Sequence, residues 1–316
     1  MPRMQRYTSS MIPRPASAPE NLRGMGLMTL AMFGFALTDL FIKLLGDAWP
    51  AGQIIASLGL GGSLVFAWLA HRQGDALFSR AFLHPAVVLR NTFEVLATLL
   101  FVNALVHSSL SVASAIVQAN PLVVTLGAAL WLKEPVGARR FSAIGVGLIG
   151  VLLIIQPWSQ RFEPASLLAV GAVFALAFRD LATRGAPKHI STALLSSYAL
   201  AMLVPAGLLL SWLQPGPPLR LPEPMQLLYL LGAIGISTIG YYAITAAMRV
   251  GDIGIVTPFR YSRIVFALII ATVVFGETID ATMLLGAAIV IATGFYTLWR
   301  ERSRATRASS HAAEHS

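Results

Sequence analysis

The stretch ALTDLFIK, residues 36–43, returns later in the chain as AFRDLATR, residues 177–184, and this repetition is the main clue to the architecture. The two copies align Asp39 with Asp180 and Lys43 with Arg184 at a spacing of 141 residues. Both copies lie within apolar runs, where an ionisable side chain normally faces a partner or a water-filled cavity. The spacing is nearly half of the 316-residue chain, so it predicts two related halves.

Two further pairs of segments repeat at a spacing of 143 residues. ALVHSSLSVA (104–113) matches AAMRVGDIGIV, which ends at residue 256, and LWLKE (130–134) matches VVFGE (273–277). We therefore interpret the chain as an internal duplication, with one copy at residues 24–157 and the other at residues 158–299.

The composition is typical of a membrane protein. Hydrophobic residues make up 56% of the chain and charged residues 12%, with a mean hydropathy of +0.71, whereas about 25% of the residues of a soluble domain are charged. Runs such as LLSSYALAMLVPAGLLLSWL (194–213) are long enough to cross a hydrocarbon core of about 30 Å as a helix. The predicted class is an all-α integral membrane protein.

Ten transmembrane helices are predicted from the positions of Pro, Gly and charged residues. They cover residues 24–45, 50–70, 85–106, 109–132, 141–157, 164–184, 191–213, 225–248, 253–275 and 281–299. Each copy of the duplication then holds five spans, an odd number, so the second copy crosses the membrane in the opposite direction to the first. Two inverted five-helix repeats are typical of secondary transporters that bind their substrate near the membrane midplane.

The distribution of basic residues predicts the orientation. The two tails and the loops on their side carry 16 Lys and Arg residues, against 2 in the loops on the other side. The positive-inside rule therefore places both termini in the cytoplasm of a cell whose inner (plasma) membrane holds the chain. Residues 1–23 and 300–316 are predicted to be disordered cytoplasmic tails.

Several other kinds of function are not indicated. The glycines of SLGLGG (57–62) lack the Gly-Lys-Ser/Thr ending of a phosphate loop, so we interpret them as helix-packing residues. The chain has no Cys and no HExxH or GxSxG pattern, so no enzymatic activity, cofactor or metal is expected. The net charge of +9 is spread over short loops, which argues against a nucleic-acid partner.

Ten spans, a five-plus-five duplication and a glutamate after the fourth and ninth spans, in LKE (132–134) and FGE (275–277), resemble EamA-type members of the drug/metabolite transporter superfamily. The resemblance covers about residues 24–299. It implies a transporter whose cavity is formed mainly by the first, third, fourth, sixth, eighth and ninth spans. Glu134 and Glu277 each precede a helix, which favours a role at a helix N-terminus.

The mirrored ionisable residues are interpreted as gates. Asp39 with Lys43, and Asp180 with Arg184 or Arg179, are predicted to line the two ends of one pathway. In the predicted topology Asp39 lies in the outer third of the first span and Asp180 in the inner third of the sixth. The alternative for Lys43 and Arg184 is that both snorkel to the interface from the ends of their spans.

The third span supplies the first predicted substrate-binding residues, Arg90, Asn91 and Glu94. Arg90 and Glu94 lie one turn apart on one helix face, and the alternative is that they form an ion pair that only neutralises itself. Such a pair still faces protein or water rather than lipid. Phe93 or Phe101 on the same span could present an aromatic face to a ring.

The fourth span supplies Gln118 and Asn120, which precede Pro121 in VQANP. Proline removes a backbone donor and kinks the helix, and the carbonyl groups that it frees are tolerated in a membrane only when buried or lining a cavity. A polar site at depth is therefore predicted here.

The ninth span contains the matching segment TPFRYSR (257–263), in which Tyr261 aligns with Gln118 and Arg263 with Asn120. Two arginines three residues apart in a span are hard to explain by packing alone. Arg260, Tyr261 and Arg263 complete the predicted substrate-binding set.

The deep charged groups are nearly balanced, with a slight positive excess, which fits an uncharged or partly negative substrate better than a cation. Arginine can stack on a planar ring, and riboflavin uptake by alternating access is our best single hypothesis. Amino-acid or metabolite efflux and S-adenosylmethionine uptake are alternatives, and a membrane scaffold or interaction protein is an alternative of another class. The expected partners are a small-molecule substrate and membrane lipid; a homodimer, the direction of transport and the coupling ion are left open.

Overall fold

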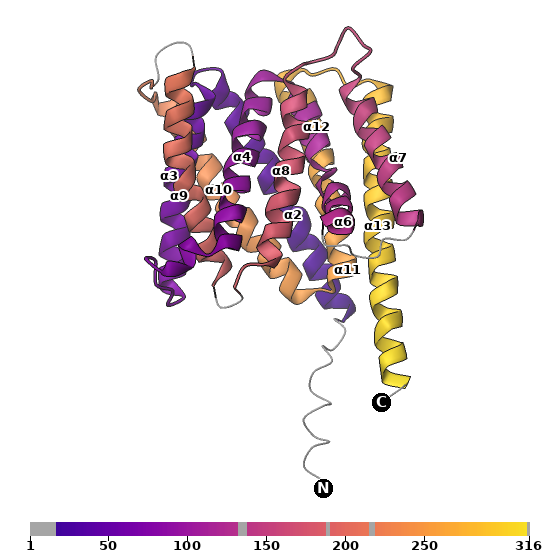
Figure 1. Cartoon of the computed structure of the whole chain (residues 1–316). Coiled ribbons are helices and arrows are strands. Elements are labelled where there is room, and N and C mark those ends of the chain that lie inside the picture. Colours follow the sequence, from indigo (N-terminus) through magenta and orange to yellow (C-terminus); the bar gives the residue numbers. More distant parts are fainter. Residues whose placement is uncertain (1–16, 132–137, 188–189, 215–218, 315–316) are drawn as a thin grey trace.

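The computed structural model is a bundle of helices, and it describes residues 17–131, 138–187, 190–214 and 219–314 (Figure 1). Within these ranges the chain forms no β-strand, so the predicted all-α class is confirmed. The helices are α2 (Ala18–Gly46), α3 (Ala51–Arg72), η1 (Arg80–Leu83), α4 (Pro85–His107), α5 (Leu110–Val117), α6 (Asn120–Trp131), α7 (Ala138–Ile155), α8 (Ser166–Arg184), α9 (Thr192–Leu213), α10 (Pro224–Val250), α11 (Ile253–Val256), η2 (Thr257–Tyr261), α12 (Ser262–Phe275) and α13 (Ala281–Glu314).

Eight helical stretches of the described residues are long and apolar enough to cross a membrane. Two further apolar stretches, Phe141–Ile155 in α7 and Ala281–Thr297 in α13, are shorter. The multi-pass helical membrane protein is thus confirmed, whereas the count of ten spans stays a prediction. Leu209, Trp212 and Val273 are more than half exposed, as expected for apolar side chains that face lipid.

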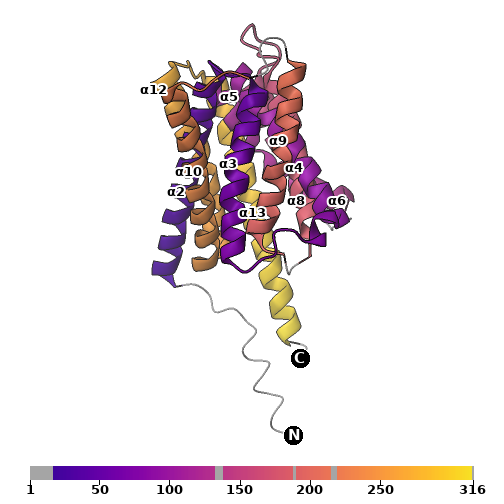
Figure 2. The same ribbon diagram turned by 90° about the vertical axis from the view of Figure 1, so that its left-hand side faces the viewer.

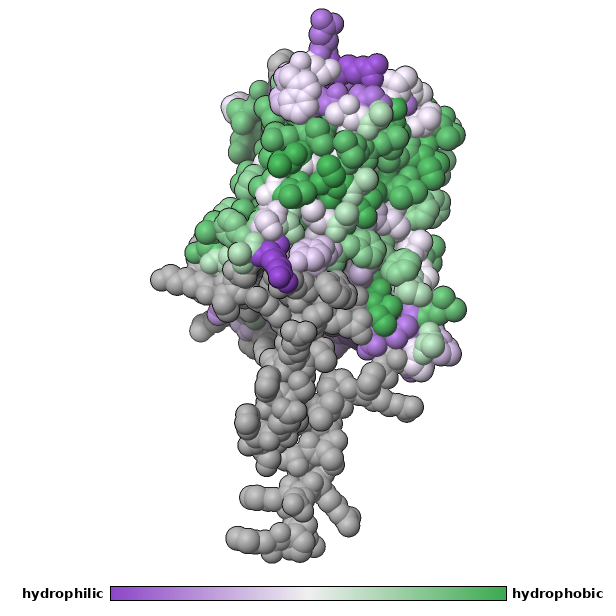
Figure 3. All heavy atoms as spheres, turned by 90° about the vertical axis from the view of Figure 1, so that its right-hand side faces the viewer, coloured by the Kyte–Doolittle hydropathy of each residue, from purple (hydrophilic) through white to green (hydrophobic). Residues whose placement is uncertain are grey.

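The face of the bundle in Figure 3 carries a broad band of hydrophobic residues. Hydrophilic residues gather at the end of the molecule opposite the termini. In Figure 1, α2 begins and α13 ends at the same end of the bundle, which we call the terminal end; the opposite end is the far end. An even number of crossings produces this arrangement.

The helix boundaries correct the two predicted tails. Ser17 and Glu20 form a capping box, in which each side chain accepts the backbone N–H of the other residue. Residues 18–23 therefore form the first turns of α2 instead of the end of a disordered tail, and residues 1–16 lie outside the described part. The backbone of α13 is helical as far as Glu314, because the Ala-, Arg- and Glu-rich sequence after residue 299 favours helix and contains no Pro.

The main helix contacts join the two copies of the repeat. The closest partners are α2 with α10, α4 with α8, α3 with α9, and α7 with α13. Each pair takes one helix from each copy. Exchanging the copies converts the α2–α10 pair into the α8–α4 pair and leaves the α3–α9 and α7–α13 pairs unchanged. The helix α2 runs from the terminal end to the far end, while α8, which begins the second copy, runs the opposite way (Figures 1 and 2).

Glycines allow two of these pairs to approach closely. A Cβ atom at Gly52 of α3 would lie 2.5 Å from the carbonyl oxygen of Gly207 in α9, and one at Gly286 of α13 would lie 2.6 Å from the carbonyl oxygen of Gly150 in α7. Gly59, in the glycine-rich stretch of α3, is packed against Leu203 in the same way. The interpretation of these glycines as helix-packing residues is confirmed.

The fourth span is broken near its middle and the ninth near its start. The fourth is divided into α5 and α6, with Gln118 and Ala119 between them and Pro121 in the first turn of α6. The ninth consists of α11, the 3₁₀ turn η2 with Pro258, and α12. As predicted, each break lies where a polar segment contains a proline.

Candidate functional site

A cavity of about 270 Å³ lies between the two copies of the repeat. Its walls come from α2, α3, α4, α5, α8, α9, α10 and α12, so the second and seventh spans contribute as well as the six that the resemblance implied. The walls are mostly apolar and include three aromatic rings, those of Phe35, Phe66 and Phe101. The polar lining residues are Thr38, Asp39, Glu94, Thr98, Ser237 and Arg263.

The buried carboxylate of Asp39 forms an ion pair with Arg263. Arg263 Nη2 lies 2.7 Å from Asp39 Oδ2 and 2.8 Å from Oδ1, and Nε lies 3.2 Å from Oδ2. Ser114 Oγ of α5 donates a further hydrogen bond to Oδ2 at 3.3 Å. Asp39 is only 2% exposed, so this two-pronged, charge-assisted contact compensates for its removal from water.

Two aromatic rings of the cavity wall also lie close to the Arg263 guanidinium. Its central carbon lies 5.8 Å from the centre of the Phe35 ring and 5.9 Å from that of Phe101. These distances are within the range of cation–π attraction. Arg263 is therefore held in place by a carboxylate and two aromatic rings while still lining the cavity.

The second mirrored aspartate, Asp180, makes a different set of contacts. Its Oδ2 accepts a hydrogen bond of 3.0 Å from Asn120 Nδ2, and its Oδ1 lies 2.7 Å from Arg179 Nη2. The predicted contact with Arg179 is present. The side chain of Arg184, the other predicted partner, lies outside the described part of the structure.

The two aspartates contact residues that are themselves repeat mates, because Arg263 aligns with Asn120. The Asp39–Arg263 contact joins α2 to α12, and the Asp180–Asn120 contact joins α8 to α6, so each links one copy to the other. We call the first the far-end pair and the second the terminal-end pair, from where Asp39 and Asp180 lie on their helices. The far-end pair is ionic, and its mate combines a carboxylate with a neutral amide.

Glu94 connects the cavity to the terminal-end pair. Both of its carboxylate oxygens accept hydrogen bonds from Arg179 Nη1, at 3.2 and 3.1 Å. Its i,i+4 neighbour Arg90 lies farther away, at 3.7 Å. Arg90 Nη1 instead donates to Asn91 Oδ1 and to the carbonyl of Leu195 in α9, each at 2.9 Å.

Arg90 and Asn91 therefore do not line the cavity, in contrast to Glu94. Both are buried, at 9% and 0% exposure, and they tie α4 to α9. The sequence correctly placed Arg90 and Glu94 on one helix face, but it did not show that Arg179 would be the closer partner of Glu94.

Lys43 corrects the predicted pairing at the far end. Its Nζ donates to the backbone carbonyls of Leu105 and Ser108, at 3.2 and 2.6 Å, and lies 5.5 Å from the centre of the Phe275 ring. The last carbonyls of α4 lack partners within their own helix, so Lys43 satisfies them while Arg263 takes Asp39.

The remaining predicted residues lie around the two helix breaks. Gln118 Nε2 donates to the carbonyl of Arg260 at 2.9 Å, which joins one broken span to the other. Tyr261 is 4% exposed and its ring stacks on Phe295 of α13, so it packs in the core and does not line the cavity. Arg260 is exposed, and its guanidinium makes no hydrogen bond or ion pair within the described residues.

Glu277 acts at a helix N-terminus, as predicted, but on a different helix from the one that follows it. Its carboxylate accepts hydrogen bonds from the backbone N–H groups of Leu110 and Ser111, at 2.7 and 3.0 Å, which begin α5. Glu163 accepts from the N–H of the preceding residue, Ser109, at 2.7 Å. The repeat mate of Glu277, Glu134, lies outside the described residues.

Several cavity residues were not found from the sequence. Phe93 stacks on Phe178, so of the two aromatic residues considered on the third span only Phe101 reaches the cavity. Ser237 lines the cavity and lies 143 residues after Glu94, so a systematic search for repeat mates of polar residues would have found it. The apolar wall from α3 and α9 has no comparable signal.

The fold and the cavity describe a polytopic membrane protein whose two related halves enclose a binding space. The sequence profile of the EamA-like transporter family matches residues 22–156 and again residues 164–299. The chain belongs to this family of membrane transporters and carries two copies of its domain. Its bacterial relatives imply an inner-membrane location.

The relatives of this chain are named as transporters of different compounds. A riboflavin transporter of Vibrio cholerae is 34% identical over 61% of this chain and 64% of its own length. The pseudopaline exporter CntI of Pseudomonas aeruginosa (strain UCBPP-PA14) is 27% identical over 85% of this chain and 93% of its own. An S-adenosylmethionine uptake transporter of Rickettsia felis is 24% identical over 90% and 96%.

The chain thus spans slightly less than two thirds of the Vibrio relative. A solved crystal structure with 18% sequence identity superposes with a TM-score of 0.59 and covers 89% of this chain and 97% of its own. That likeness supports the fold.

Proposed function

We propose that this chain is a secondary transporter that imports riboflavin across the inner membrane by alternating access. The name of the Vibrio cholerae relative supports the substrate. The opposite directions of α2 and α8, together with the exchange symmetry of the helix pairs, support two inverted repeats that rock around the cavity.

The matched charges of the cavity carry the substrate proposal. Its two carboxylates, Asp39 and Glu94, are each bound by an arginine, Arg263 and Arg179 respectively. Among the described lining residues, the cavity therefore offers no unpaired negative charge to a cation. It presents the rings of Phe35, Phe66 and Phe101, which suit a planar, uncharged ring system that stacks on aromatic faces.

The volume of the cavity is consistent with a partly closed state. At about 270 Å³ it lies just below the range of about 300–1,000 Å³ that is usual for small-molecule sites. Opening at either end would enlarge it. Arg263, Thr38, Thr98 and Ser237 would then supply hydrogen bonds to the polar atoms of the ring or to a polyol tail.

The proposed topology follows the basic residues. We count ten spans, of which the apolar stretches of α7 and α13 are the two shorter ones. With this count, both termini lie on the side that carries 16 of the Lys and Arg residues of the loops and tails. This places the terminal end of the bundle in the cytoplasm and the far end outside.

Uptake by a riboflavin-requiring bacterium that lacks its own importer tests the substrate. Cells that produce the chain should accumulate radiolabelled riboflavin, and Phe101→Ala should reduce the rate strongly because a cavity ring is lost. Phe174→Ala is the matched control, since Phe174 lies on α8 and is 44% exposed. No uptake by cells with verified protein in the membrane would remove riboflavin import.

Metabolite export is the second candidate. The exporter from Pseudomonas aeruginosa aligns over a larger share of this chain than the Vibrio relative does. Cells preloaded with labelled riboflavin would distinguish the two directions, because an exporter would accelerate loss of the label. The paired carboxylates disfavour S-adenosylmethionine, which is a cation, although a relative carries that name.

A further inference from the structure

The short helix α5 connects the far end of the bundle to the cavity. It is only eight residues long, Leu110–Val117. Near its inner end, Val117 lines the cavity and Ser114 Oγ donates to Asp39. Any displacement of α5 therefore changes both the cavity wall and the far-end pair.

The outer end of α5 is held by two carboxylates from the second copy of the repeat. Glu277 accepts the N–H groups of Leu110 and Ser111 and the hydroxyl of Ser111, the last at 2.5 Å. Glu163 accepts the N–H and the hydroxyl of Ser109. The N-terminus of a helix attracts negative charge, and hydrogen bonds to a charged acceptor are stronger than neutral ones.

We propose that Glu163 and Glu277 are positioning residues that hold α5 against the second copy of the repeat and so keep the far end of the transport path closed. The two carboxylates belong to loops of the second copy, while α5 belongs to the first. The far end cannot open between the two copies unless these contacts break. Neither glutamate lines the transport cavity, so each acts through α5.

Solvent can reach this clamp from the far end. Glu163 and Glu277 line a second cavity of about 350 Å³, together with Ser109, Ser111 and Arg161. Water that enters it can compete for the N–H groups of α5 once a carboxylate is lost. Removing one negative charge therefore weakens the closed state without leaving a dry, unsatisfied helix end.

Among the described residues, the terminal end also has a contact between the two copies of the repeat. There Asn21 of α2 accepts the N–H of Asp252 at 2.7 Å, just before α11, and donates to its carboxylate at 3.3 Å. These hydrogen bonds tie α2 to the segment that leads into α11, so they link the two copies of the repeat at the terminal end.

The experiment measures access to the cavity from each side. The chain has no cysteine, so Thr98→Cys, placed in the cavity wall, is a unique site for a membrane-impermeant maleimide. Labelling is measured in right-side-out and inside-out membrane vesicles without substrate. Rates are normalised to Gln160→Cys, an exposed position in the loop between α7 and α8 at the far end.

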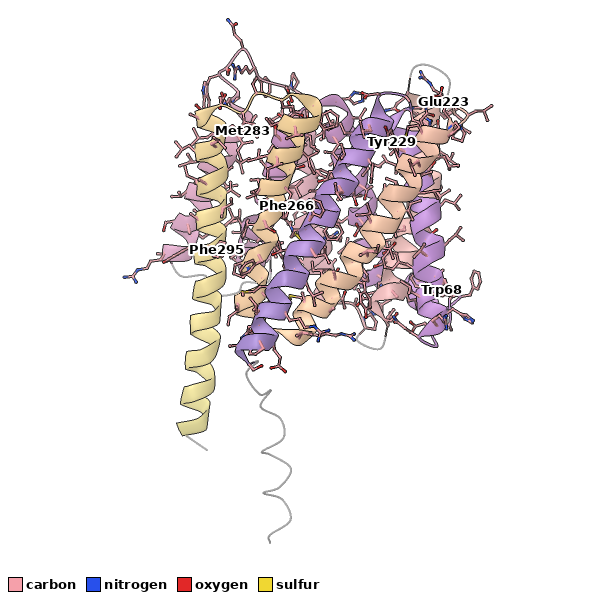
Figure 4. The ribbon with its side chains drawn as sticks, turned by 180° about the vertical axis from the view of Figure 1, so that it is seen from behind. Trp68, Glu223, Tyr229, Phe266, Met283 and Phe295 are labelled. Carbon is pink, nitrogen blue, oxygen red and sulfur yellow. The ribbon has the colours of Figure 1, made fainter. Side chains whose placement is uncertain are left out.

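Glu277→Gln and Glu163→Gln should each raise the rate at which Thr98→Cys is labelled from the far side by roughly fivefold. This factor corresponds to the free energy of a partly buried charge at a helix end. Labelling from the terminal side should fall, because the two states compete. Asn21→Ala should shift both rates in the opposite directions. Glu223→Gln is the control, since Glu223 lies at the same end of the bundle as Met283 of the second cavity but takes part in neither set of contacts (Figure 4).

Unchanged labelling in both glutamine variants would overturn the proposal, and so would an equal rise from both sides, which is the signature of general loosening. The inference rests on the transport path proposed above, but the assay contains no riboflavin, so a wrong substrate leaves its outcome intact. If Gln160→Cys is labelled only in inside-out vesicles, the proposed orientation is wrong. Labelling from the far end is then the rate that inside-out vesicles give.

Discussion

Arg90 and Arg260 are both predicted from the sequence to bind the substrate, but they lie in different surroundings. Arg90 is 9% exposed and bonds Asn91 and the carbonyl of Leu195. Arg260 is exposed and lies within electrostatic reach of Asp180 of the terminal-end pair. The first is tied into the packing of two helices, whereas the second does not line the cavity, and its guanidinium makes no hydrogen bond or ion pair among the described residues.

Substitution should separate these roles. Arg90→Ala should lower the free energy of unfolding by about 1–3 kcal/mol, because it leaves buried hydrogen-bonding groups without a partner. Arg260→Ala should leave stability unchanged and reduce the rate of riboflavin uptake. Thermal unfolding in detergent and uptake at equal protein level check the two effects. Loss of stability in Arg260→Ala with normal uptake would contradict this assignment.

Asp280 provides a test of the far end by pH. The N–H of Met283 and the amide of Gln156 donate to its carboxylate and lower its pKa below the ordinary aspartate value. The stabilisation is then complete above about pH 3.9 and disappears as the pH falls through the lowered pKa. Asp280→Ala should lower the free energy of unfolding by about 1 kcal/mol at pH 7 and by less at pH 3, and thermal unfolding at the two pH values is the measurement. An equal effect at both pH values would exclude the charge as the cause.

Which residues are deep and ionisable could be predicted from the sequence, but their partners could not. Asp39 and Lys43 share one face of α2 because they are four residues apart, yet Arg263, 224 positions later, forms the ion pair. Contacts between helices depend on how the two copies pack against each other, and the sequence around one residue does not show this packing. Arg179 with Asp180 was predictable because the two are neighbours in the chain.

At the scale of helices, glycine contacts determine how closely α3 approaches α9. Gly207→Ala should destabilise the protein by about 1–3 kcal/mol, because the added Cβ would lie 2.5 Å from the backbone nitrogen of Ala56. Gly235→Ala in α10 is the matched control, since no atom lies within 4 Å of a Cβ there. Thermal unfolding of the two variants is the measurement, and equal stability would contradict the packing argument.

The broken helices were predictable because proline and polar residues coincide in VQANP and TPFRYSR. The start of α2 and the end of α13 were predicted less well. The capping box at Ser17 and Glu20 extends α2, and a run of good helix formers extends α13, while hydropathy reports only the apolar part of each helix.

Over the whole molecule, the repeat predicts that the two mirrored aspartates act on opposite ends. Asp39→Asn weakens the far-end pair and should favour opening at the far end. Asp180→Asn weakens the terminal-end pair and should favour the opposite opening. Labelling of Thr98→Cys from the two sides checks this, and shifts in the same direction in both variants would refute it.

The duplication was visible in the sequence and is confirmed by the two family matches. The participation of α3 and α9 in the cavity was not visible, because Leu58, Leu200 and Leu203 look like any lipid-facing leucines in an apolar run. The unequal chemistry of the two ends depends on which side chains meet, so it also required the structure.

The central claim is that the cavity between the two copies binds riboflavin, and equilibrium binding to the purified protein tests it most directly. The fluorescence of riboflavin should be quenched with saturation at one site per chain, because the ring stacks on cavity aromatics. Phe101→Ala should weaken binding about tenfold, the effect expected for loss of one aromatic contact, and Phe174→Ala should not. Absence of saturable binding, or equal affinity in the two variants, would contradict the claim.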